Sequence, residues 1–202
     1  LLEAIAALVD PSRGKLCCDR KSVGHLGERE RQLWQSRIGM SFQNDALFDS
    51  LSVFDNVAFP LRETRVAEVE VKLRVDRALE DVSLGHAASR FPSEISGGMR
   101  KRVGIARATV IDPEFGLFDD PTAGLDPASS ESILELIVNQ AKRLGNATVV
   151  VSNDLPVLFP ICDRVVMLNG GEVLYDGSVA NILESGRSEV TQFVTGSDSG
   201  PL

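Results

Sequence analysis

Two short apolar runs, separated by one long amphipathic stretch, constrain the fold most strongly. The runs FGLFD at 115–119 and ATVVVS at 147–152 are almost free of charge, whereas residues 127–144 have the pattern of a helix. Asp126 is suited to cap the start of this helix, a proline follows it, and a glycine stands at the helix end. Strand, helix and strand in this order predict an α/β fold with a parallel sheet whose strands are covered on both faces.

Periodicity and turn residues predict the remaining elements. The charged stretch 65–82 keeps its apolar residues on one stripe, which predicts an amphipathic helix of a small helical subdomain. The apolar residues of this stripe are Val71, Val75, Ala78 and Val82. An opening helix is expected, with Leu1, Ile5 and Leu8 at helical spacing, and a further helix after SGG should bury Met99, Val103, Ala106 and Val110. The other expected helices lie at 28–35 and 53–59, and the other strands at 15–18 and 37–43. LNGGEV is expected to form a hairpin turn at the far edge of the sheet.

Composition and charge exclude several classes of protein. A chain of 202 residues with 43% hydrophobic residues is long enough for one well-buried domain. The net charge of −8 argues against a nucleic-acid partner, because phosphate binding needs clustered lysine and arginine. Three cysteines without disulfide or zinc spacing favour a reducing, cytosolic compartment. No apolar run reaches the length of a membrane span, so at a membrane another chain would have to do the spanning.

Several polar residues are expected at one edge of the sheet. Asp119 and Asp120 end a buried strand, and carboxylates at the carboxyl end of a parallel strand face the crevice where ligands bind. Asp119 is therefore placed to hold hydrated Mg²⁺, although an isolated DDP is more typical of turn acids before a proline. Gln43 and Asn153 close two other strands, and two glycines precede a helix whose free amides suit a phosphate.

The ordered set of these residues resembles the ATP-binding subunit of an ABC transporter. Gln43 matches the Q-loop of that family, Ser96-Gly97-Gly98-Met99 its signature loop, 115–119 its Walker B strand, and Asp126 its D-loop. The resemblance covers essentially the whole chain. The stretch FQNDALFDSLSVFDNVAFPLRE and the methionine after SGG are similar to the Mla or Mce branch, which transports phospholipids and is linked to toluene tolerance.

The resemblance implies a P-loop NTPase core with an inserted helical subdomain at about 53–112, leaving 1–52 and 113–202 as the core. The family's first strands and its Walker A loop are expected before Leu1, because no G-x4-G-K-[ST] occurs in the sequence and RGKL lacks both the earlier glycine and the hydroxyl residue. We therefore expect a fragment rather than a truncated pseudoprotein. Residues 1–202 by themselves should bind ATP very weakly.

The resemblance also implies a role for each site residue. Asp119 would hold Mg²⁺ through water, Asp120 would orient the attacking water or accept its proton, and Gln43 would sense the Mg²⁺. The residues expected to bind ATP are Ser96, Gly97, Gly98, Met99 and Asp126, with the signature loop contacting the γ-phosphate in the opposite subunit. Without the family, Gln43 would more often be a solvated strand end, and a helix cap and a turn adequately explain Asp126 and Asn153.

The expected partners follow from the same resemblance. They are a second ATPase subunit in a head-to-tail dimer, a membrane permease, and indirectly an Mce-type substrate-binding protein. The expected location is cytoplasmic and peripheral on the inner membrane. A groove beside Gln43 should receive a short permease helix. Its apolar candidates are Phe48, Leu51, Phe54 and Phe59.

Two departures from the family pattern leave alternatives open. Asp120 stands where the family has Glu, and Asn153 where it has His, which contacts the γ-phosphate. Asp is shorter by roughly 1.5 Å of reach, and Asn cannot carry positive charge. The leading hypothesis is an ATPase that drives lipid transport, and the alternative is a catalytically impaired, nucleotide-binding regulatory subunit or inactive fragment. A soluble ABC protein acting on ribosomes or DNA is disfavoured by the acidic charge.

Overall fold

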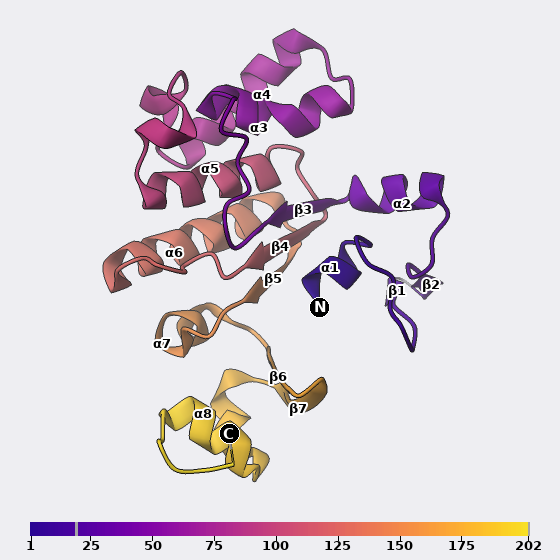
Figure 1. Ribbon diagram of the computed structural model, residues 1–202, viewed down its shortest axis with the longest axis vertical. Coiled ribbons are helices and arrows are strands. Elements are labelled where there is room, and N and C mark those ends of the chain that lie inside the picture. The colour runs from indigo at the N-terminus through magenta and orange to yellow at the C-terminus, as the bar shows by residue number, and fades with distance from the viewer. Residues whose placement is uncertain (19, 202) are drawn as a thin grey trace. The chain divides into compact units, whose positions relative to one another are not determined.

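The structure is a computed structural model that describes residues 1–18 and 20–201. The chain forms two compact units, Leu1–Ser152 and Asn153–Leu202 (Figure 1). None of the helices in the described part of the chain is long and apolar enough to cross a membrane.

A three-stranded parallel sheet is the centre of the first unit. Its strands are β3 (Ile38–Ser41), β4 (Phe115–Asp119) and β5 (Ala147–Val151), with β4 in the middle. All three run in the same direction, so their carboxyl ends meet at one edge (Figure 1). The α/β fold with a parallel sheet is confirmed, and it places the segments after each strand side by side.

The two apolar strands are not covered equally. Leu117 and Phe118 of β4 are buried, as predicted. In β5, however, burial alternates, and Val149 and Val151 are 38% and 40% exposed. The prediction that both faces of this strand are covered is therefore wrong, because the face that carries Val149 and Val151 is exposed. Among the described strands, β5 is also an edge strand that pairs with β4 alone.

Three helices pack together beside β3. They are α3 (Val53–Glu63), α4 (Glu68–Asp81) and α5 (Gly97–Thr109), with short 3₁₀ turns at Gly85–Ala87 and Pro92–Glu94 between the last two (Figure 1). The whole predicted stripe of the charged helix is buried, which confirms its amphipathic character. On α5, Val103, Ala106 and Val110 are buried as predicted, whereas Met99 is half-buried.

Helix α6 (Pro127–Leu144) has the ends that its sequence predicts. The Asp126 side chain accepts a hydrogen bond from the Ser129 amide at 3.0 Å, and Gly145 ends the helix with a left-handed φ of 63°. Glycine adopts this conformation without strain, so local residues alone account for both boundaries.

The start of the chain packs differently from its prediction. Helix α1 (Leu2–Ile5) is short, and its neighbours are the hairpin β1 (Cys17–Cys18) with β2 (Lys21–Ser22) and helix α2 (Glu28–Gln35). The opening stripe is not the buried face: Leu1 is 68% exposed, while Leu2 packs with Trp34 and Leu117 in one core cluster. The Trp34 indole donates a hydrogen bond to the Ile5 carbonyl, which fixes the end of α1 against α2.

The second unit is a small α+β body. Strands β6 (Val165–Asn169) and β7 (Glu172–Gly177) form the hairpin predicted at LNGGEV, but as a two-stranded sheet of their own rather than an edge of the main sheet. Leu174, Ile182 and Val190 form the core of this unit. Its helical elements are α7 (Leu155–Leu158), α8 (Ser188–Thr195) and 3₁₀ turns at Phe159–Ile161 and Val179–Ser185.

Candidate functional site

Residues from three strand ends meet around the carboxylate of Asp120. Gln43 follows β3, and its side-chain amide nitrogen donates a hydrogen bond to Oδ2 of Asp120 at 3.2 Å. Ser152 follows β5, and its hydroxyl donates to Oδ1 of the same carboxylate at 3.4 Å. The structure thus brings Gln43 and Asp120 together at the carboxyl edge, as strand order predicts. Ser152 is an additional contact that sequence analysis did not identify.

The backbone of Asp120 is unusual for a residue other than glycine. Its φ is +43°, in the left-handed region, and its amide donates to the carbonyl of Val151 at 2.7 Å. Such a conformation costs free energy and persists only where neighbouring structure holds it. The turn after β4 therefore directs the Asp120 side chain toward Gln43 and Ser152 rather than continuing the strand.

The donor set at this edge suits a magnesium ion. Asp119 supplies a carboxylate at the last position of β4, and the side-chain nitrogen of Gln43 is engaged with Asp120, which leaves its amide oxygen as the group for a cation. Mg²⁺ prefers oxygen ligands and keeps several waters. Within the described residues, no group of three acidic, histidine or cysteine side chains forms a complete metal cage, so the ion would also depend on water and phosphate oxygens.

The segment after β3, residues 42–46, is held by basic side chains of α5; we call it the Q-loop segment. Lys101 is 7% exposed, and its ammonium donates to the Gln43 carbonyl at 2.5 Å and lies 3.2 Å from Oδ1 of Asp45. Arg107 donates to the carbonyls of Asp45 and Ala46, each at 2.7 Å. Burial lowers the pKa of Arg107, and the nearby Asp45 carboxylate opposes that shift.

Lys101 and Arg107 were not among the residues predicted for the site, although the sequence carries a signal for Lys101. Lys101, Gly104, Ile105 and Ala108 recur at helical spacing, and all four are buried. Helix α5 is therefore buried on two sides, and a lysine within such a stripe needs a partner.

The signature loop lies at the N-terminus of α5. The Ser96 hydroxyl accepts a hydrogen bond from the Met99 amide at 3.3 Å and caps the helix. A Cβ atom added at Gly97 or Gly98 would come no closer than 3.7 Å and 4.0 Å to other atoms, and neither residue has a positive φ. Neither packing nor backbone conformation therefore requires glycine at these two positions. Glycines here fit a backbone that a ligand approaches closely.

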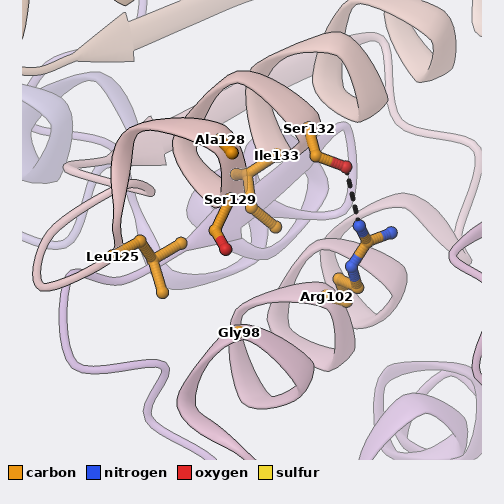
Figure 2. A pocket seen from close by; sticks show the side chains of 7 residues that line it. All are labelled: Gly98, Arg102, Leu125, Ala128, Ser129, Ser132 and Ile133. Carbon is orange, nitrogen blue, oxygen red and sulfur yellow. Dashed lines mark hydrogen bonds between the residues drawn. The ribbon is translucent and has the colours of Figure 1, made fainter.

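A hollow of about 280 Å³ lies between this loop and α6 (Figure 2). Across it, the Arg102 guanidinium donates a hydrogen bond to the Ser132 hydroxyl at 2.8 Å. The residues that line the hollow are Gly98, Arg102, Leu125, Ala128, Ser129, Ser132 and Ile133. The signature loop and the start of α6 thus border one cavity.

Asp126 is engaged in its own helix. Its carboxylate accepts hydrogen bonds from the Ser129 hydroxyl at 2.6 Å and from the Ser129 amide, and these bonds lower the pKa of Asp126. The cap is a sufficient explanation for this residue. Asn153 begins the second unit, so its expected position at the γ-phosphate stays a prediction.

An apolar hollow of about 440 Å³ lies beside the Q-loop segment. Phe48 and Phe59 line it, with ring centroids 4.7 Å apart and side chains 41% and 38% exposed. The buried side chain of Asn56 holds Phe48 by accepting from its amide and donating to its carbonyl. Leu51 and Phe54, also expected in this groove, are half-buried and are not among the lining residues.

Comparison with known proteins identifies the family. The family described as ABC transporter matches residues 1–123. The chain is 38% identical to the intermembrane phospholipid transport system ATP-binding protein MlaF of Haemophilus influenzae, over 100% of this chain and 77% of that protein. The chain belongs to the ABC transporter ATP-binding family.

Other relatives are equally similar in sequence. The methionine import ATP-binding protein MetN of Bordetella pertussis is 38% identical over 95% of this chain, which spans only 53% of that protein. The chain thus spans about three quarters of its MlaF relative and about half of its MetN relative.

Solved structures agree with the fold. CbiO1 of Clostridium perfringens, part of the ABC transporter complex cbiONQ, superposes with a TM-score of 0.82 at 28% identity, over 98% of this chain and 78% of that one. The ABC cassette MJ0796, in a dimer bound to ADP and phosphate, gives 0.80 at 30% identity, over 88% and 78% of the two chains. The P-loop NTPase fold predicted from the sequence motifs is confirmed.

Proposed function

We propose that this chain is part of a subunit that binds and hydrolyses ATP to power an ABC transporter. The observation that carries the proposal is the Asp120 carboxylate at the edge of a parallel sheet, next to Asp119 and hydrogen-bonded to Gln43. Three strand ends of one sheet contribute to this arrangement, as expected where phosphate and metal bind in an α/β fold.

In the proposed reaction, the protein supplies position and charge rather than covalent chemistry. Asp120 accepts a proton from the attacking water or orients it, and Gln43 holds the Asp120 carboxylate in place. Asp119 and the oxygen of Gln43 would hold Mg²⁺ together with water, and the ion, when bound, neutralises charge on the phosphate oxygens. Ser96, Gly97 and Gly98 would bind the γ-phosphate of ATP held by a second subunit in a head-to-tail dimer, with Met99 and Asp126 beside them.

The transported substrate is proposed to be a phospholipid, as in the Mla or Mce branch. The alignment with the MlaF relative spans 100% of this chain and 77% of that protein, against 95% and 53% for the MetN relative. Because the two identities are equal, transport assays must decide. We expect loss of the gene to change the lipid composition of the cell envelope and to leave methionine uptake intact, and the opposite result would place the protein with the methionine importers.

The membrane partner is proposed to be a permease that inserts a short cytoplasmic helix into the apolar hollow beside the Q-loop segment. Phe48 and Phe59 are exposed there and offer apolar contact. The subunit would then lie peripherally on the cytoplasmic side of the inner membrane, with an Mce-type substrate-binding protein reached only through the permease. If Phe48→Asp leaves co-purification with the permease unchanged, this surface is not the dock.

Two substitutions at Asp120 test the proposed activity in the natural protein with its membrane partner. Asp120→Asn should lower ATP turnover by at least about a hundredfold and leave ATP binding intact, because the amide cannot accept the proton. Asp120→Glu should raise ATP turnover, because it restores the longer side chain that the family has at this position. Asn153→His should raise turnover further, and the gain of the double variant should differ from the sum of the two single gains. Phosphate release is the measurement.

The alternative is a regulatory subunit that binds ATP without useful turnover. The departures at Asp120 and Asn153 favour it. It predicts that Asp120→Asn leaves the slow phosphate release of the parent unchanged and that Asp120→Glu gives no gain.

A further inference from the structure

A buried lysine of α5 holds the Q-loop segment from a helix that begins at the signature loop. The ammonium of Lys101 contacts the Gln43 carbonyl at 2.5 Å and the Asp45 carboxylate at 3.2 Å. A buried ammonium is unfavourable unless it is paired and hydrogen-bonded. Since both partners of Lys101 belong to the Q-loop segment, this lysine is satisfied when the segment has the conformation observed.

The backbone of the Q-loop segment does not favour this conformation by itself. Asp45 and Ala46 are consecutive non-glycine residues with φ of +61° and +45°. Left-handed conformations of this kind are disfavoured for residues with a Cβ atom. The carbonyls of both residues accept hydrogen bonds from Arg107, so contacts from α5 compensate for the local cost.

Helix α5 is also fixed against β3 at very close range. A Cβ atom on Gly39 would lie 1.9 Å from the Ala108 carbonyl oxygen, so the two backbones nearly touch there. Ser96 caps the first turn of α5, and Lys101 lies in its next turn. The signature loop and Lys101 therefore belong to one helix that is packed tightly on β3.

These contacts form one continuous path through the first unit. It runs from the N-terminus of α5 to Lys101, from the Lys101 ammonium to the Gln43 carbonyl, and from the Gln43 side chain to the Asp120 carboxylate. Each step is a hydrogen bond, part of a single helix, or the covalent link between the carbonyl and the side chain of Gln43.

We propose that Lys101 is a positioning residue: it links the helix of the signature loop to the Q-loop segment and so keeps the Gln43 side chain directed at Asp120. The effect of Lys101 on catalysis rests on the proposed ATPase function, whereas its contacts with the Q-loop segment do not. In this scheme Lys101 touches neither nucleotide nor metal.

The first test measures, without any nucleotide, how strongly Lys101 stabilises the conformation of the Q-loop segment. Lys101→Met removes the charge and the donor while keeping a long side chain. Lys101→Met/Asp45→Asn also removes the Asp45 carboxylate, which the single variant leaves with only Arg100, 3.9 Å away, as an ion-pair partner. Lys72→Met on α4, where Lys72 pairs with Asp76 at the surface, is the matched control. Backbone hydrogen exchange of 42–46 should become about tenfold faster in both Lys101 variants and stay unchanged in the control.

The Asp45 amide, which donates to the Phe42 carbonyl at 2.9 Å, reports this change directly. Exchange in β4 serves as an internal reference, because global destabilisation would accelerate it as well. The double variant should regain most of the thermal stability that the single variant loses, since it no longer buries an Asp45 carboxylate whose nearest cation has been removed. Its Q-loop segment should nevertheless exchange fast.

The second test measures ATP turnover in the natural protein with its membrane partner. Both Lys101 variants should lower kcat by about tenfold and change KM for ATP less than twofold, because a misdirected Gln43 affects the attacking water rather than nucleotide binding. A role in stability alone would instead let the double variant recover kcat together with its thermal midpoint.

Two results would overturn the proposal. One is unchanged exchange of 42–46 in Lys101→Met, and the other is full recovery of kcat in the double variant. If the parent shows no ATP turnover, the proposed function fails, while the exchange comparison still decides whether Lys101 holds the Q-loop segment.

Discussion

Two acids in the same loop after β4, Asp120 and Asp126, are held in opposite ways. Asp126 accepts hydrogen bonds from the amide and hydroxyl of Ser129, three residues later in the first turn of α6. Asp120 accepts from Gln43, after β3, and from Ser152, after β5, which are distant in sequence. The first acid would keep its contacts in an isolated helix, whereas the second has them only when the sheet is assembled. A site built on Asp120 therefore depends on every contact that aligns the three strands.

Separating α5 from β3 should have the largest effect on the contacts of Asp120 and leave those of Asp126 in place. Gly39→Ala places a methyl group in contact with the Ala108 backbone and should lower the free energy of unfolding by about 3 kcal/mol or more. The Gln43 contact with Asp120 should be lost, while the Asp126 cap persists. Denaturant unfolding of the variant measures the effect. Gly27→Ala, whose Cβ would meet only Glu30 at 3.6 Å, is the matched control and should cost about 1 kcal/mol or less.

Removing the two partners of Asp120 one at a time sharpens the comparison. Gln43→Ala should lower ATP turnover by about tenfold, and Ser152→Ala by about threefold, because the Gln43 bond is shorter and is itself supported by Lys101. Steady-state phosphate release at saturating ATP is the measurement. Equal effects of the two variants would mean that the support from α5 does not reach Asp120.

The smallest expected effect concerns the local acid. Asp126→Ala removes the cap of α6 and should lower the melting temperature by a few degrees, without the large loss of turnover expected at Asp120. Thermal unfolding followed by circular dichroism measures it. A hundredfold loss of turnover in Asp126→Ala would show that this residue acts in the site and not only as a cap.

The contribution of Asp126 should also depend on pH. Hydrogen bonds from Ser129 hold its pKa in the folded protein below the ordinary value of 3.8. A carboxyl whose folded pKa is lowered stabilises the protein above its unfolded pKa and loses that effect as pH falls through the folded value. The melting temperatures of parent and Asp126→Ala should therefore converge below about pH 3.8 and differ by a constant amount at neutral pH. A difference that grows on acidification would contradict this assignment.

Sequence patterns identified the helical elements whose signals are local. The bounds of α2 and α6 agree with the prediction, because charged turns, a capping acid and a glycine stop lie within or next to each helix. Helix α3 continues through Pro60 to Glu63, beyond the predicted Phe59. Its buried face, which packs on α4 and α5, keeps it helical where the proline alone indicates an end.

The sequence by itself determined the α/β order of the elements, the capped helix after Asp126, and the family motifs at Gln43, Ser96 and Asp119. These depend on short-range periodicity and on residue types at fixed spacing. Only the tertiary structure decided that β5 is covered on one face, that Lys101 is buried beneath the Q-loop segment, and that Ser152 joins Gln43 at Asp120. The physical reason is that burial and hydrogen-bond partners of these residues come from distant parts of the chain, and no local pattern specifies which strands and helices meet.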